Sequence, residues 1–78
     1  MEEKVIRMLE GICETEGIAE NKDMDLFDAG LIDSLGFVDL LVQIEENFGL
    51  SVAPTDVDKA DISSVNKLTA FLRGRGVN

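Results

Sequence analysis

Apolar residues recur at helical spacing in three stretches of the chain. In the first stretch, positions 5, 8, 9 and 12 share one face, which predicts a helix from Glu2 to about Glu16 that closes at Gly17. A second helix is predicted to begin at Ser34 or Leu35 and to run to about residue 47, with a glycine at position 49 to end it. A last helix begins after a serine N-cap, at position 63 or 64, and ends among the arginines and glycines of residues 73–76.

The second predicted helix carries more apolar residues than one face requires. Its core face repeats at i, i+4, i+7 and i+11 through Phe37, Leu41, Ile44 and Phe48. Four more apolar residues widen this face: Leu35, Val38, Leu40 and Val42. We therefore expect this helix to lie at the centre of the fold, in contact with both other long helices and with part of the loop before it. The remaining side is acidic, with Asp39, Glu45 and Glu46.

The segments between the helices predict one long loop and one short helical turn. Residues 17–33 mix glycines and aspartates with scattered apolar side chains, which is typical of a long loop held on a core by its own side chains. Pro54 follows an extended segment and is expected to open a short helical turn through Asp58 or Lys59. The pattern predicts an all-α fold, a small four-helix bundle of three longer helices and one short helix, in a single domain over residues 1–78.

Composition and charge narrow the classes of function. A chain of 78 residues has little room for a deep catalytic cleft, and it contains no histidine, tryptophan or tyrosine. The formal net charge of -9, from 16 acidic and 7 basic residues, repels nucleic acid and anionic lipid and favours basic surfaces on other proteins. These features disfavour an independent enzyme and a nucleic-acid-binding protein, and they favour protein partners.

Neither the cysteine nor the aspartates of the loop predict a metal or catalytic site. Cys13 is the only cysteine, so no internal disulfide can form, and its helical surroundings predict a small buried side chain. The carboxylates of Asp23, Asp25 and Asp28 do not fit a calcium loop, since Asp28 stands where that loop requires glycine and Ser34 where it requires a bidentate acid. Residues 1–4 lack the start of a secretory signal, and no segment approaches the ~20 apolar residues of a membrane span, which predicts a cytoplasmic protein with no membrane insertion.

The most informative motif is Asp33-Ser34-Leu35, at the predicted start of the second helix. A serine at that position lies among free backbone N–H groups and at the positive end of the helix dipole, so a phosphodiester on its hydroxyl would be stabilised. The alternative is that Ser34 is only an N-cap, in which case its replacement by alanine costs about 0.5–2 kcal/mol. The motif alone leaves both interpretations open.

The chain resembles the phosphopantetheine-binding carrier proteins over nearly all its length, in the order of its elements and in the Asp33-Ser34-Leu35 motif. The resemblance implies that Ser34 accepts 4'-phosphopantetheine from coenzyme A through a separate phosphopantetheinyl transferase, with Asp33 and Leu35 beside it. It also implies a non-catalytic monomer that is charged by an adenylating ligase or acyltransferase and delivers its thioester to a downstream acceptor enzyme. We expect partners to dock on the second helix, at Leu35, Val38, Asp39, Glu45 and Glu46.

Within this family the chain is most similar to D-alanyl carrier proteins. The resemblance rests on residues 25–30, 33–36 and 38–48 and on Asn66-Lys67. Two features differ from that subgroup: Leu35 stands where methionine often follows the serine, and residues 59–62 lack an aromatic side chain. A free-standing acyl carrier for fatty acid or polyketide biosynthesis is the alternative, and an acidic helical interaction module without a cofactor is the alternative from another class.

Overall fold

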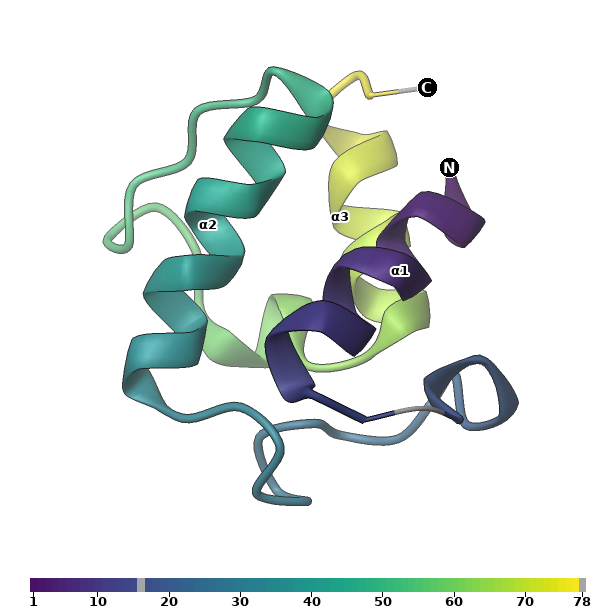
Figure 1. Cartoon of the computed structure of the whole chain (residues 1–78). Helices are drawn as coiled ribbons and strands as arrows, with labels where there is room; N and C mark the ends of the chain where they lie inside the picture. The colour runs from purple at the N-terminus through teal and green to yellow at the C-terminus, as the bar shows by residue number, and fades with distance from the viewer. Residues whose placement is uncertain (16, 78) are drawn as a thin grey trace.

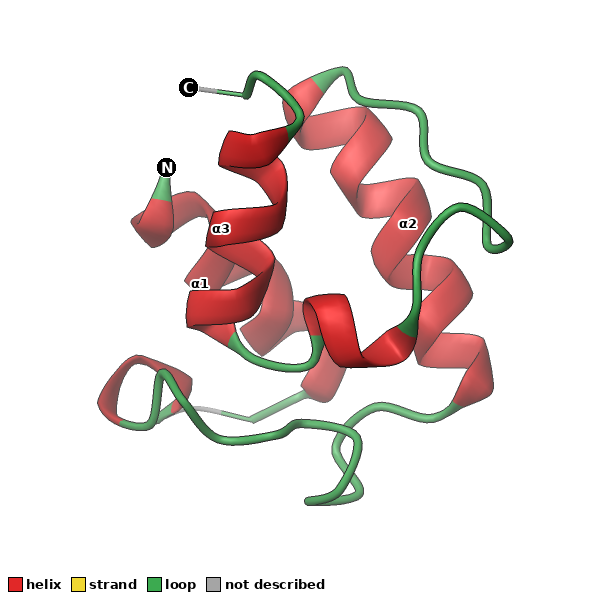
Figure 2. Cartoon of the chain, turned by 180° about the vertical axis from the view of Figure 1, so that it is seen from behind, coloured by secondary structure: helices red, strands yellow, loops and turns green. Residues whose placement is uncertain are grey.

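The computed structural model describes residues 1–15 and 17–77, and in these ranges the chain forms helices and loops but no strand (Figures 1 and 2). Three α-helices, α1 (Glu2–Cys13), α2 (Ser34–Phe48) and α3 (Val65–Gly74), are accompanied by two 3-10 helices, η1 (Ile18–Glu20) and η2 (Lys59–Ile62). The expected all-α class is confirmed. None of the helices in the described residues is long and apolar enough to cross a membrane.

The first helix ends earlier than expected. α1 stops at Cys13, and Glu14 takes a left-handed conformation with φ 53°, from which its N–H donates to the Glu10 carbonyl. Residue 16, where we expected the helix to end, lies outside the described residues. At the other end of α1, the Lys22 ammonium pairs with Glu2 and holds the pKa of that carboxyl below its usual value.

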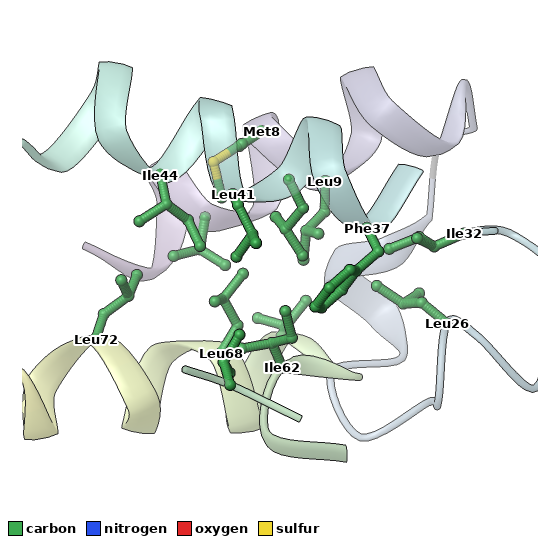
Figure 3. Close-up of a cluster of buried hydrophobic side chains, with 14 of the residues drawn as sticks. Met8, Leu9, Leu26, Ile32, Phe37, Leu41, Ile44, Ile62, Leu68 and Leu72 are labelled. Carbon is green, nitrogen blue, oxygen red and sulfur yellow. The ribbon is translucent and has the colours of Figure 1, made fainter. Parts of the chain in front are cut away.

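α1, and not α2, is the helix that packs against both of the others. Our expectation that α2 is the central helix is therefore wrong, but its expected contact with the preceding loop is confirmed at Phe27 and Ile32. Side chains from all three helices meet in one hydrophobic core (Figure 3). The largest fully buried side chains of this core come from every element of the chain: Leu9, Ile18, Leu26, Leu40, Ile44, Ile62, Leu68 and Leu72.

The apolar residues of α2 divide between the core and the solvent. The predicted core face is confirmed at Phe37, Leu41 and Ile44, and Leu40 joins it. Leu35, Val38 and Val42, which we expected to widen the buried surface, instead remain 81%, 48% and 47% exposed. They lie at i, i+3 and i+7 on the side of α2 that no other element covers, so the extra apolar character of this helix forms a surface stripe.

The segment between α1 and α2 is fixed to the start of α3. Its Leu26 is fully buried, and the Leu26 N–H donates to the Ser63 carbonyl at 2.7 Å. The Asn66 side-chain amide donates to Asp23 at 2.6 Å, and the Asn66 N–H donates to the carbonyl of residue 22. Because these bonds join residues about 40 positions apart, the segment has a defined place on the bundle.

The short helical segment before α3 begins later than Pro54. Residues 54–56 form a turn, and the helical segment is η2, which starts after Asp58. A capping box fixes that start: the Asp58 carboxylate accepts from the backbone of Asp61, whose own carboxylate accepts from the Asp58 N–H. The start of α3 agrees with the prediction, because the Ser64 hydroxyl oxygen accepts from the N–H of residue 67 at 3.2 Å.

Candidate functional site

Asp33, and not Ser34, caps the amino terminus of α2. The Asp33 backbone is extended, and its carboxylate accepts from the Gly36 N–H at 2.8 Å, while its carbonyl accepts from the Phe37 N–H at 2.9 Å. Ser34 is the first residue of the helix itself. The interpretation of Ser34 as an N-cap is therefore wrong, and its hydroxyl is not needed to satisfy the helix backbone.

The Ser34 side chain is exposed, and its hydroxyl has no hydrogen-bond partner within the part of the chain that the structure describes. It stands in the first turn of a helix of 15 residues, where unpaired backbone N–H groups carry the positive end of the dipole. The site thus offers a free nucleophilic oxygen in surroundings that favour a negative charge.

A tight, hydrogen-bonded turn over residues 25–32 packs against the first turn of α2. The Asp25 carboxylate accepts from the N–H groups of Phe27 and Asp28, both at 3.0 Å, and the Leu31 N–H closes the turn onto the Leu26 carbonyl. Ile32 then packs so closely on the first turn of α2 that a Cβ at position 36 would lie 2.9 Å from the Ile32 Cγ2. Glycine at position 36 therefore permits the approach of the turn to the helix.

An aromatic pair with a lysine above it joins this turn, α2 and η2. The rings of Phe27 and Phe37 lie 6.2 Å apart and are tilted by 59°. The Lys59 ammonium lies 5.8 Å from the centre of the Phe27 ring and 6.0 Å from that of Phe37, which is a cation–π arrangement with two partners. Sequence reasoning missed this cluster, although Lys59 is conspicuous as the only basic residue between Lys22 and Lys67.

The predicted docking residues all lie on exposed positions of α2. Leu35 and Val38 belong to the apolar stripe, which Val42 continues, and the three carboxylates named for docking, Asp39, Glu45 and Glu46, are exposed. Residues 34–48 contain no lysine or arginine. The exposed side of α2 therefore carries apolar side chains and carboxylates but no basic side chain.

The other candidate residues have structural explanations. Cys13 is half-buried, and burial raises the pKa of its thiol. Among the loop aspartates, Asp25 holds the turn described above and Asp23 accepts the bond from the side chain of residue 66. Each of these carboxylates thus stabilises the loop.

The sequence matches the family model described as a phosphopantetheine attachment site over residues 3–72. The chain belongs to the phosphopantetheine-binding carrier proteins. The carrier is similar to a D-alanyl carrier protein of Abiotrophia defectiva, with 45% identity over 75 residues that cover 96% of this chain and 95% of the relative. It is also similar to a D-alanyl carrier protein of Bacillus velezensis, with 39% identity over 71 residues, which are 86% of this chain and 91% of the relative.

Membership of this family gives the protein a carrier function without catalysis of its own. Its cofactor is a covalently bound 4'-phosphopantetheine, whose terminal thiol, when the group is bound, holds an acyl or aminoacyl cargo as a thioester. The carrier therefore depends on other proteins for loading of the arm and for transfer of the cargo.

Proposed function

We propose that Ser34 is the attachment residue and that this carrier delivers D-alanine. The observation that carries the proposal is the exposed hydroxyl of Ser34 at the first position of α2, which has no hydrogen-bond partner among residues 1–15 and 17–77 and stands next to the aspartate that caps the helix. Attachment forms a phosphodiester at the Ser34 Oγ and breaks the pyrophosphate bond of coenzyme A, which releases 3',5'-adenosine bisphosphate. The hydroxyl proton passes to a base of the transferase. The residues fit the group, since the helix dipole offsets the charge of the new phosphodiester.

Intact mass spectrometry tests the attachment. The protein is incubated with coenzyme A and a broad-specificity phosphopantetheinyl transferase, beside the variants Ser34→Ala and Ser51→Ala; Ser51 is an exposed serine outside the helices and serves as a matched control. We expect one adduct on the parent and on Ser51→Ala, and none on Ser34→Ala. An adduct on Ser34→Ala would refute the assignment. No adduct on any folded form would favour the acidic interaction module instead.

The names of the relatives support D-alanine as the cargo. The loaded carrier is offered D-alanine, L-alanine or a fatty acid, each with ATP and the adenylating ligase specific for it. The thioester is measured as an increase in intact mass that is lost after mild hydroxylamine treatment, because hydroxylamine cleaves thioesters. We expect transfer with D-alanine and its ligase. Efficient charging only by fatty acid or polyketide enzymes would favour the alternative of a free-standing acyl carrier.

The exposed side of α2 is the proposed docking surface for the transferase, the ligase and the acceptor enzyme. Apolar residues next to the attachment point give contact area, and the carboxylates at positions 39, 45 and 46 steer basic partners toward it. Replacing Val38 by serine should slow loading and have only a small effect on stability, because about half of this side chain is already exposed. Replacing Glu45 and Glu46 by glutamine should reduce the salt dependence of loading, whereas Glu20→Gln on η1 should leave it unchanged.

We further infer that residues 1–78 act as one domain and as a monomer in the cytoplasm, where coenzyme A supplies the cofactor. The family match over residues 3–72 and the shared hydrophobic core support the single domain. In this interpretation η2 corresponds to the short helix of the predicted four-helix bundle. The segment between α1 and α2 corresponds to the predicted long loop.

A further inference from the structure

We propose that Lys59 is a positioning residue for the phosphopantetheine arm, and that its ammonium contacts the phosphodiester formed on Ser34. The inference rests on the proposed attachment at Ser34. Its structural basis is the position of one cation, held over the rings of Phe27 and Phe37, at the end of the bundle where α2 begins.

The geometry places the ammonium beside the first turn of α2. Phe37 follows Ser34 by three residues, which is about 4.5 Å along the helix axis, so the two residues lie within one turn of each other, Phe37 buried and Ser34 exposed. Helical side chains lean toward the amino terminus, so the Phe37 ring lies beside the first turn of α2, on its core side (Figure 3). The Lys59 ammonium, 6.0 Å from that ring, therefore lies close to the amino-terminal end of α2. Figure 1 agrees, since η2 lies at the same end of the molecule as the first turn of α2.

The charges around the site explain why a phosphodiester needs this lysine. Eight aspartates occur in the sequence between residues 23 and 61: Asp23, Asp25, Asp28, Asp33, Asp39, Asp56, Asp58 and Asp61. Lys59 is the only basic residue among them, and in the described part of the chain its ammonium forms no ion pair. Without it, residues 23–61 would offer an added phosphate no cationic side chain.

The two rings give Lys59 a defined position without neutralising it. A cation over an aromatic face is attracted by the ring quadrupole but keeps its charge and its N–H donors. Phe27 comes from the turn and Phe37 from α2, so the lysine is fixed relative to both elements that frame Ser34. The expected ligand is thus a phosphate monoanion that approaches from the solvent side, as an arm on Ser34 would.

Nuclear magnetic resonance of the protein before and after loading tests the contact directly. With ¹³C-labelled lysine, the Cε signals of Lys4, Lys22, Lys59 and Lys67 are compared in the apo and loaded forms, after mass spectrometry has established the adduct. We expect loading to move the signal of Lys59 and to leave that of Lys67, an exposed lysine on α3, in place. Equal or absent changes at Lys59 and Lys67 would overturn the proposal.

The ³¹P signal of the loaded protein gives a second measurement that a purely structural role would not affect. In the parent, the shift should move with added NaCl as the ion pair dissociates; in Lys59→Met it should not, while Lys67→Met should behave as the parent. Lys59→Met keeps the aliphatic contact with the rings, and Lys59→Arg should restore the salt response. Relative to Lys59→Met, the parent should populate the arrangement in which the phosphate lies close to residue 59 about two- to five-fold more. This is the usual contribution of an exposed ion pair.

The outcomes separate this inference from the proposed function. If Ser34→Ala still accepts the group, or if the parent accepts none, the attachment itself is wrong. If the parent loads at Ser34 but Lys59→Met retains the salt response of the ³¹P shift, the attachment stands and the role of Lys59 is refuted.

Discussion

Asp33 caps α2, whereas Ser34 is the proposed attachment residue. We therefore predict that replacing Asp33 lowers stability and that replacing Ser34 abolishes loading. Asp33→Ala removes the carboxylate that accepts the Gly36 N–H at 2.8 Å. Loss of such a cap costs about 0.5–2 kcal/mol. The negative charge at the helix start adds about 0.3–1 kcal/mol. Ser34→Ala removes a hydroxyl that bonds to no described residue, so its effect on the free energy of unfolding should stay within about 0.5 kcal/mol.

Thermal unfolding followed by circular dichroism measures this difference. For a chain of this size, a loss of about 1.5 kcal/mol lowers the melting temperature by about 6–12 °C. We expect that decrease in Asp33→Ala, almost none in Ser34→Ala, and a smaller decrease in Asp33→Asn, which keeps a capping oxygen but loses the charge. If Ser34→Ala is destabilised as much as Asp33→Ala, then Ser34 contributes to the cap and the reasoning from the helix start is refuted.

Two further predictions concern the glycines in helices and the thiol of α1. Gly11→Ala should stabilise the protein by about 0.5–1 kcal/mol in urea unfolding, because glycine is costly inside a helix and no atom within 4 Å obstructs a methyl group. Gly36→Ala should not stabilise it, since the new Cβ meets buried Ile32; an equal gain in both variants would contradict the close packing. The raised pKa of Cys13 leaves less thiolate at pH 8, so iodoacetamide should alkylate Cys13 more slowly in the folded apo protein than in urea, and equal rates would contradict its burial.

The sequence predicted the ends of helices best where one residue type decides them. Gly49 takes the left-handed conformation expected after α2, and Ser64 caps α3. At the start of α2, however, Asp33 and Ser34 are both good capping residues, and the choice between them depends on how the turn packs against the helix. The start of the short helical segment is set by Asp58 and Asp61, which stand at capping-box spacing in the sequence. The prediction relied instead on Pro54, which also favours the start of a helix, and therefore placed the segment too early.

The candidate site was predictable in its chemistry and less so in its surroundings. The motif and the helix pattern indicated Ser34, because a phosphate on a helix start needs only local features. Which apolar residues of α2 face solvent depends on where α1 lies, and the spacing of Leu35, Val38 and Val42 is equally compatible with a wide buried face. The contact of Lys59 with two rings joins three distant segments and is beyond any local pattern.

The exposed apolar stripe of α2 also affects how the free protein behaves in solution. Copies that present Leu35, Val38 and Val42 attract one another through these side chains, and at neutral pH the net charge of -9 keeps them apart. Near the isoelectric point of about 4.2 this repulsion disappears, and at high salt it is screened. Colloidal stability of the purified carrier should therefore fall under both conditions while its helices remain folded, and light scattering should register the change before circular dichroism does.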